Sequence, residues 1–323
     1  MYRRQSTGGD AGVERYYESG RGYYSPELAG QERDRFAISL ATLDGSLYQV
    51  GDYEHAFPMH SISKVFSYAL ALQDWGREAV MRRVGVEPSG DAYNSIRFDE
   101  RSHRPHNPMI NAGALATTAL VRGGSTQEQL DRILDLVGRM SGNHELSVDL
   151  SVFERETETA DRNRATAYLM RENGMLSGDV EEILALYLKQ CAITVTCADL
   201  AVMGATLANG GACPVTGERI LSRQVNRDVL SVMYTCGMYD FAGEWAFQVG
   251  VPAKSCVSGG IIAVIPGKLG IGVYSPGLDR FGNSVRGVRV CQEVSEHLGL
   301  HLFATEVEDV MFETPSVVEP SAG

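Results

Sequence analysis

The sequence predicts an α/β protein of the α+β type, in which both ends of the chain form one antiparallel sheet. Strand-like segments lie near both ends and pair across short turns, at residues 36–43 with 46–50 and 260–265 with 269–274. Between residues 57 and 239 the pattern is helical and contains little convincing strand. A sheet packed with helices, interrupted by a large helical insertion, is the simplest arrangement of these elements.

The turns between the paired strands carry the residues that tight hairpins require. Asp44-Gly45 separates the first pair, and both residues tolerate a positive φ. Pro266-Gly267-Lys268 separates the second pair. Each pair is therefore expected to be a hairpin.

The helices follow from apolar periodicity and from their end signals. Residues 61–72 are mostly apolar and contain neither Gly nor Pro, which predicts a buried helix. The helix that starts at Cys197 is expected to end before Gly210-Gly211. The further helices are expected at residues 127–140, 179–190, 197–209 and 285–298.

Composition limits the possible partners and the compartment. The 323 residues carry 29 Lys plus Arg against 41 Asp plus Glu, a net charge of −12, which argues against nucleic acid and against an anionic membrane surface. No apolar run reaches the length of a spanning helix, and the first residues resemble no export signal. Six cysteines without a Cys-x-x-Cys pair predict free thiols. We therefore expect a cytoplasmic protein that binds a small molecule.

The chain divides into one folded unit and two tails. Residues 1–15 and 306–323 are small, polar or proline-bearing and are expected to be mobile. Residues 16–305 are expected to form a single catalytic unit. Its sheet lobe would comprise about 16–60 and 240–305, and its helical lobe about 61–239.

The chemistry begins with an S-x-x-K motif at a predicted helix start, Ser61-Ile62-Ser63-Lys64. Residues i and i+3 share one face of a helix, so the Lys64 amine can reach the Ser61 hydroxyl. Lysine can activate a serine when burial lowers the lysine pKa. The backbone N–H of Ser61 could also stabilise an oxyanion. The structural alternative is a capping serine with a lysine that reaches along apolar surface to solvent.

A second motif, Lys254-Ser255-Cys256-Val257, opens a predicted strand. In serine hydrolases of the β-lactamase class, a Lys-[Ser/Thr]-Gly strand lines the cleft opposite S-x-x-K. Both motifs occur here in the right order and on the right elements. The usual Ser-Asp-Asn and Tyr-x-Asn motifs are absent, so Tyr187 or Tyr239 would have to carry the proton.

Residues from about 24 to about 300 resemble the serine-dependent glutaminases, which share the β-lactamase-like fold of penicillin-binding proteins. The resemblance rests on residues 86–90 (VEPSG), 106–114 (HNPMINAGA), 156–163 (ETETADRN), 205–211 (ATLANGG) and 236–240 (CGMYD). It implies hydrolysis of L-glutamine to L-glutamate and ammonia through an acyl-serine intermediate. It also implies a homo-oligomer, a dimer or a tetramer. The groups involved require no metal and no organic cofactor.

The resemblance also assigns roles to residues. Ser61 would be the nucleophile, Lys64 its base and Tyr239 the proton relay, with the backbone N–H groups of Ser61 and Val257 forming the oxyanion hole. A Glu156 carboxylate can pair with the substrate ammonium, while amide and phenol groups bind the substrate carboxylate. The residues expected at the amino-acid end of the substrate are Tyr24, His60, Asn111, Glu156, Asn163 and Tyr187.

Each of these residues has a structural alternative. Asn111 could cap a helix, and Glu156 and Asn163 stand in a charged segment where most side chains are merely solvated. The three tyrosines could simply pack in the core.

Two positions depart from the family pattern, and two other functions stay open. His60 stands where the family usually has Gln, and Cys256 where it usually has Gly; we expect the Cys256 thiol to face away from the cleft. One alternative is an acyl-serine hydrolase of the penicillin-recognising class, which the missing Ser-Asp-Asn motif disfavours. The other is a glutamine-binding module with weak turnover, because both departures lie beside the reacting centre.

Overall fold

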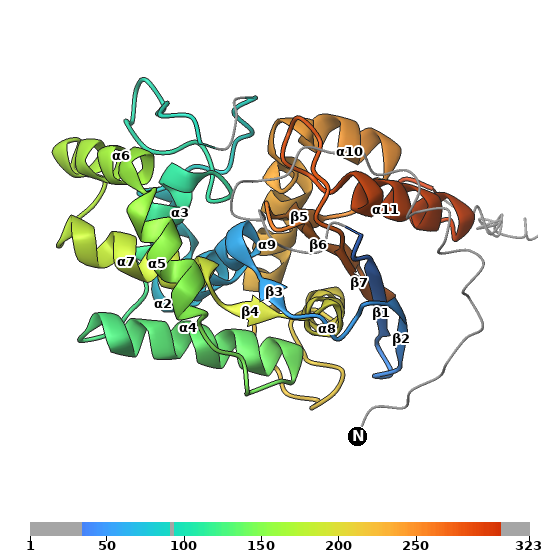
Figure 1. Cartoon of the computed structure of the whole chain (residues 1–323). Helices are drawn as coiled ribbons and strands as arrows, with labels where there is room; N and C mark the ends of the chain where they lie inside the picture. Colours follow the sequence, from blue (N-terminus) through green and yellow to red (C-terminus); the bar gives the residue numbers. More distant parts are fainter. Residues whose placement is uncertain (1–33, 91–93, 305–323) are drawn as a thin grey trace, which may run out of the picture.

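A five-stranded antiparallel sheet of order β2-β1-β7-β6-β5 forms from the two ends of the described chain (Figure 1). Its strands are β1 (Ala37–Thr42), β2 (Leu47–Gly51), β5 (Ala253–Ser255), β6 (Gly260–Ile265) and β7 (Leu269–Tyr274). The computed structural model describes residues 34–90 and 94–304, so Tyr24 and both expected tails lie outside the described residues. The predicted fold class is confirmed, with both hairpins as expected.

The pairing of β1 with β7 joins the two ends of the chain. Ala37 lies opposite Tyr274 and Thr42 opposite Leu269, so all six residues of each strand are in register. The hairpin turn before β2 places Gly45 at a φ of 82°, a conformation that glycine adopts without steric cost. The three-residue strand β5 forms one edge of the sheet, next to the S-x-x-K segment.

Helices fill the chain between the strands. Two short 3-10 turns, η2 (His60–Ile62) and η3 (Tyr239–Phe241), and a two-stranded pair, β3 (Phe57–Pro58) with β4 (Thr194–Val195), complete the described structure. The α-helices are α2 (Ser63–Met81), α3 (Asn111–Thr118), α4 (Thr126–Ser141), α5 (Leu150–Glu158), α6 (Asp161–Glu172), α7 (Val180–Cys191), α8 (Cys197–Ala208), α9 (Arg223–Cys236), α10 (Ala242–Gln248) and α11 (Val285–His297).

The predicted helices are present, and several others were not predicted. The buried helix α2 continues past residue 72 to Met81, across a kink at Gly76 where φ is 74°. The unpredicted helices α6 and α9 have weak sequence signals. Few residues of α6 are buried, and α9 contains three valines, Val225, Val229 and Val232, a residue type that favours strands. None of the described helices is both long and apolar enough to span a membrane.

The two faces of the sheet contact different helices. Alternate residues of β6 point to opposite faces, so Ile261 and Ala263 pack with α10 and α11, whereas Ile262 and Val264 pack on the α8 side. Figure 1 shows α10 and α11 over one face and α8 against the other. The helical half of the molecule extends from the α8 side.

Glycines allow α8 to lie directly on β7. A Cβ atom on Gly270 would lie 2.1 Å from the Ala205 nitrogen, and one on Gly272 would lie 2.3 Å from the Cys197 carbonyl oxygen. A Cβ atom on Gly204 of α8 would in turn lie 3.0 Å from the Gly270 Cα. The central strand and the central helix therefore touch backbone to backbone, which larger residues would prevent.

This contact predicts the effect of one added methyl group. Gly270→Ala should lower the free energy of unfolding by about 2 kcal/mol or more, because the methyl would meet backbone that cannot move aside. Gly243→Ala in α10 is the matched control, since no atom lies within 4 Å of its added Cβ. Urea denaturation of the three proteins measures the difference. Equal stability of both variants would contradict the close contact.

Candidate active site

Ser61 lies in the buried turn η2, between β3 and α2. The residue before it, His60, has a φ of 39°, a left-handed conformation that is uncommon for a residue other than glycine. Ser61 itself is 7% exposed. Such backbone outliers occur preferentially at functional sites, where the surrounding structure holds them in place.

The amine of Lys64 contacts the Ser61 hydroxyl and does not reach solvent. The Lys64 side chain is completely buried, and its Nζ donates hydrogen bonds to Ser61 Oγ at 3.0 Å and to Asn111 Oδ1 at 2.7 Å. Burial disfavours the charged form and lowers the pKa of Lys64 to about 8. More of the amine is therefore neutral near pH 7 than for an exposed lysine.

Asn111 connects the Ser61–Lys64 pair to the helical half. Its Oδ1 also accepts a hydrogen bond from the Tyr187 hydroxyl at 3.3 Å, and its Nδ2 donates to Asn163 Oδ1 at 3.0 Å. The Asn111 side chain does not cap α3, so the structural alternative for this residue is wrong. Burial raises the pKa of Tyr187 well above its usual value, which keeps the phenol protonated.

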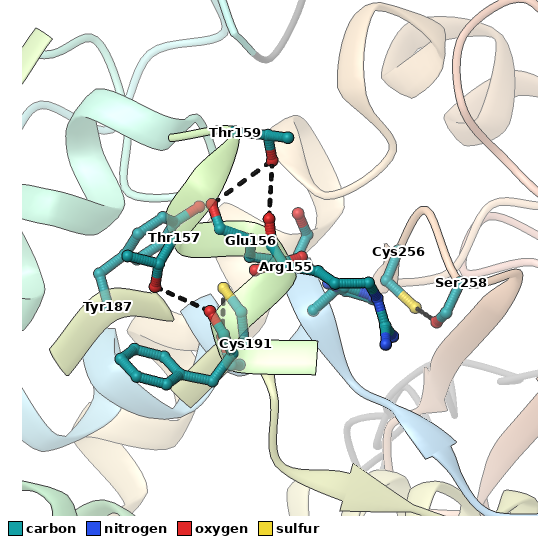
Figure 2. Close-up of polar contacts among 12 residues, drawn as sticks. Arg155, Glu156, Thr157, Thr159, Tyr187, Cys191, Cys256 and Ser258 are labelled. Atoms are coloured by element: carbon teal, nitrogen blue, oxygen red, sulfur yellow. Dashed lines mark hydrogen bonds and ion pairs between the residues drawn. The ribbon is translucent and has the colours of Figure 1, made fainter. Parts of the chain in front are cut away.

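Glu156 faces His60 at the same site. The Glu156 Oε1 lies 2.7 Å from His60 Nδ1, and the two side chains are only 15% and 5% exposed. In Figure 2, Glu156 lies with Tyr187 and Cys191, apart from the bonded Cys256–Ser258 pair on the right of the view. Glu156 is therefore not a freely solvated carboxylate.

Tyr239 lies on η3 with a φ of 58°, also in the left-handed region. Its hydroxyl donates to the Ser255 carbonyl oxygen at 3.0 Å. Lys254 Nζ donates to the same oxygen at 2.7 Å and to the Gly237 carbonyl oxygen at 3.0 Å, and it lies 4.1 Å from the centre of the Tyr239 ring. Burial, with the nearby charge of Lys64, lowers the pKa of Lys254 well below its usual value.

Val257, whose backbone N–H is a predicted oxyanion donor, lies in the turn between β5 and β6. Within residues 34–90 and 94–304, neither the Ser61 N–H nor the Val257 N–H donates to a protein acceptor. The intervening Cys256 is completely buried, with its Sγ 2.8 Å from Ser258 Oγ. Its thiol is thus closed off from solvent. All six cysteines of the chain are buried and unpaired.

Comparison with known proteins identifies the family. The family model described as Glutaminase matches residues 21–303. The chain belongs to the glutaminase family. It is 59% identical to the glutaminase of Trichormus variabilis over 280 residues, covering 87% of this chain and 84% of that protein. It is 45% identical to glutaminase 2 of Clostridium perfringens over 291 residues, covering 89% and 95%.

Solved structures support the same conclusion. The glutamate form of Mglu superposes with a TM-score of 0.88 at 46% identity, covering 94% of this chain and 71% of that one. The probable glutaminase ybaS gives 0.86 at 35% identity, covering 91% and 96%. The predicted β-lactamase-like fold is thereby confirmed. Glutaminases hydrolyse glutamine to glutamate and ammonia, which is the activity that the sequence predicted, and the penicillin-recognising alternative is disfavoured.

The structure brings most of the predicted site residues together. Ser61, Lys64, Asn111, Asn163 and Tyr187 form one hydrogen-bonded chain, and His60 with Glu156 lies beside it. Tyr24 lies outside the described residues, so its placement at the site stays a prediction. No group of three or more His, Cys, Asp or Glu in the described chain is arranged to hold a metal ion.

Sequence reasoning missed Lys254 as a residue of the site. It was noted only as the first letter of its motif, yet its Nζ joins the Gly237 turn to β5 and covers the Tyr239 ring. A lysine in a strand whose residues are all buried is the signal that could have identified it.

The contact of Asn111 with Lys64 predicts a pH effect. Asn111→Asp places a carboxylate 2.7 Å from the Lys64 amine and should raise the lysine pKa above its present value of about 8. With the neutral Lys64 amine as the predicted base, the rise of kcat/KM with pH should move to higher pH. Asn163→Asp is the matched control: Asn163 contacts Asn111, not Lys64, and should cause a smaller displacement. Superimposable profiles for all three enzymes would disprove the coupling.

Proposed function

We propose that this chain hydrolyses L-glutamine through an acyl-serine intermediate on Ser61. The observation that carries the proposal is the buried Lys64 amine, 3.0 Å from Ser61 Oγ and with a pKa lowered to about 8. The neutral amine takes the Ser61 proton as Oγ attacks the side-chain amide carbon of glutamine. No other described group contacts the Ser61 hydroxyl.

The remaining steps use groups around this pair. The tetrahedral oxyanion is stabilised by the Ser61 and Val257 N–H groups, which have no protein acceptor in the described chain. The proton taken by Lys64 passes through the Tyr239 hydroxyl to the amide nitrogen as the carbon–nitrogen bond breaks and ammonia leaves. Water then attacks the acyl-serine, releases glutamate and returns the proton to Ser61.

The amino-acid end of glutamine is bound by the groups on α3, α5, α6 and α7. The Glu156 carboxylate pairs with the substrate ammonium, and the buried phenol of Tyr187 and the amides of Asn111 and Asn163 bind the substrate carboxylate. Tyr24 completes this set as a prediction. L-Glutamate, the product, presents the same two groups and is the expected product ligand.

Location, assembly and lobe structure are part of the same proposal. Six buried, unpaired thiols suit a reducing compartment such as the cytoplasm. A homo-oligomer, dimer or tetramer, is expected, and light scattering of the purified protein measures it. The division into a sheet lobe (about 16–60 and 240–305) and a helical lobe (about 61–239) stays a prediction. By sequence α8 belongs to the helical lobe, yet it packs on the sheet.

Removing either member of the Ser61–Lys64 pair tests the acyl-serine step. Ser61→Ala and Lys64→Ala should each reduce ammonia release to background, and the double variant should be little worse, because the two act as one unit. Ser63→Ala is the matched control from the same motif; its hydroxyl contacts Cys191, so activity should remain. Glutamate binding to Ser61→Ala, measured by calorimetry, should persist.

Two results would contradict this mechanism. Substantial activity of Ser61→Ala would rule out an acyl-serine intermediate. Tight glutamine binding by the native protein without ammonia release would instead favour the binding module with weak turnover.

Glu156 tests the substrate assignment. Glu156→Gln keeps the shape of the side chain and removes the charge, so it should cost about 2–5 kcal/mol of glutamate affinity. N-acetylglutamine lacks the ammonium and should be a poor substrate of the native enzyme for the same reason. Hydrolysis of free and N-acetylated glutamine with equal kcat/KM would disprove the assignment.

A further inference from the structure

The His60 imidazole contacts the Glu156 carboxylate, the group proposed to bind the substrate ammonium. The Nδ1–Oε1 separation of 2.7 Å is that of a strong, charge-assisted hydrogen bond. His60 makes this contact from a left-handed backbone conformation, with a φ of 39°. It lies in the turn η2, in which His60, Ser61 and Ile62 are all buried. Glu156 therefore already has a partner before a substrate ammonium arrives.

We propose that the Glu156 carboxylate cannot balance a protonated His60 and the substrate ammonium together, so that amino-acid binding expels a proton from His60 while the imidazole keeps its contact with Glu156. The inference rests on the proposed function, in which Glu156 binds the ammonium. It makes His60 a residue that determines affinity for free α-amino acids. The proton goes to solvent, and no covalent bond changes.

The carboxylate in direct contact with His60 is that of Glu156. The titratable residues on α2, α7 and β5, which pack against η2 or α5, are Lys64, Tyr68, Asp74, Arg77, Glu78, Glu181, Glu182, Tyr187, Lys189, Cys191 and Lys254. Tyr239 lies on η3, Cys256 directly follows β5, and α5 itself carries Glu154, Arg155 and Glu158. Burial raises the pKa values of Tyr187 and Cys191, so both are neutral near pH 7. Glu154, Arg155 and Glu158 are solvent-exposed.

Binding of the substrate ammonium brings a second cation to Glu156. The ammonium and an imidazolium would then share one largely buried carboxylate, with the Lys64 amine nearby. Like charges at such distances disfavour one another. A neutral imidazole still donates its Nδ1–H to Oε1 and keeps the carboxylate oriented. Loss of the other ring proton is therefore the least costly response.

The consequence is an affinity that depends on pH through His60. Imidazoles commonly change charge between about pH 5 and 8. Where His60 is protonated in the free site, affinity for glutamate should fall as pH falls, by up to about tenfold per pH unit. A glutamine side chain at position 60 donates an N–H to Glu156 without a charge and should remove this dependence.

Calorimetry of L-glutamate binding tests the proposal. Titrations from pH 5.5 to 8.5, each repeated in two buffers that hold that pH and differ in ionisation enthalpy, measure the protons released. The native protein should release up to one proton more than His60→Gln in the acidic half of the range. His60→Asn is a second variant, because asparagine tolerates a left-handed φ.

The outcomes separate this inference from the proposed function. Equal proton release by the native protein, His60→Gln and His60→Asn would overturn the inference, even if Glu156→Gln weakens glutamate binding. Unchanged glutamate affinity in Glu156→Gln would instead overturn the ammonium assignment, and the inference with it. Loss of the extra proton in both His60 variants, with Glu156→Gln weakened, would support both.

Discussion

The complete burial of the Lys64 amine is the constraint on which the site depends. A charged ammonium without water is unfavourable, and here its hydrogen bonds go to Ser61 Oγ and Asn111 Oδ1. Burial thus has two linked effects: it lowers the lysine pKa to about 8, and it fixes the direction of the amine. The helices around α2 exclude water from it, so the helical half of the chain is needed to lower the lysine pKa.

Backbone strain on both sides of the nucleophile is held by polar contacts. His60 and Tyr239 both have a positive φ, a conformation that costs on the order of 1–3 kcal/mol per residue. The contact with the Glu156 carboxylate holds His60, and the Ser255 carbonyl oxygen with Lys254 holds Tyr239. The same side chains that are assigned to chemistry therefore also keep the turns in place.

Local patterns explain what the sequence could predict. Alternating apolar residues and two-residue to three-residue turns identify β1, β2, β6 and β7, and i,i+3 spacing brings Lys64 to Ser61. Contacts between distant segments leave no such pattern. The approach of α8 to β7 depends on glycines in both elements, and the partners of Asn111 and His60 come from separate helices. The family resemblance named these site residues but not their contacts.

The two buried lysines show why burial alone does not make a base. Lys64 and Lys254 are both completely buried, and burial lowers the pKa of each. Lys254 contacts two backbone carbonyl oxygens, which have no proton to give, so it can only donate. Lys64 contacts a hydroxyl, which carries a transferable proton. The chemical nature of the acceptor, more than the degree of burial, therefore supports the proposal that Lys64 is the base, while Lys254 holds Tyr239 and the turn before it against β5.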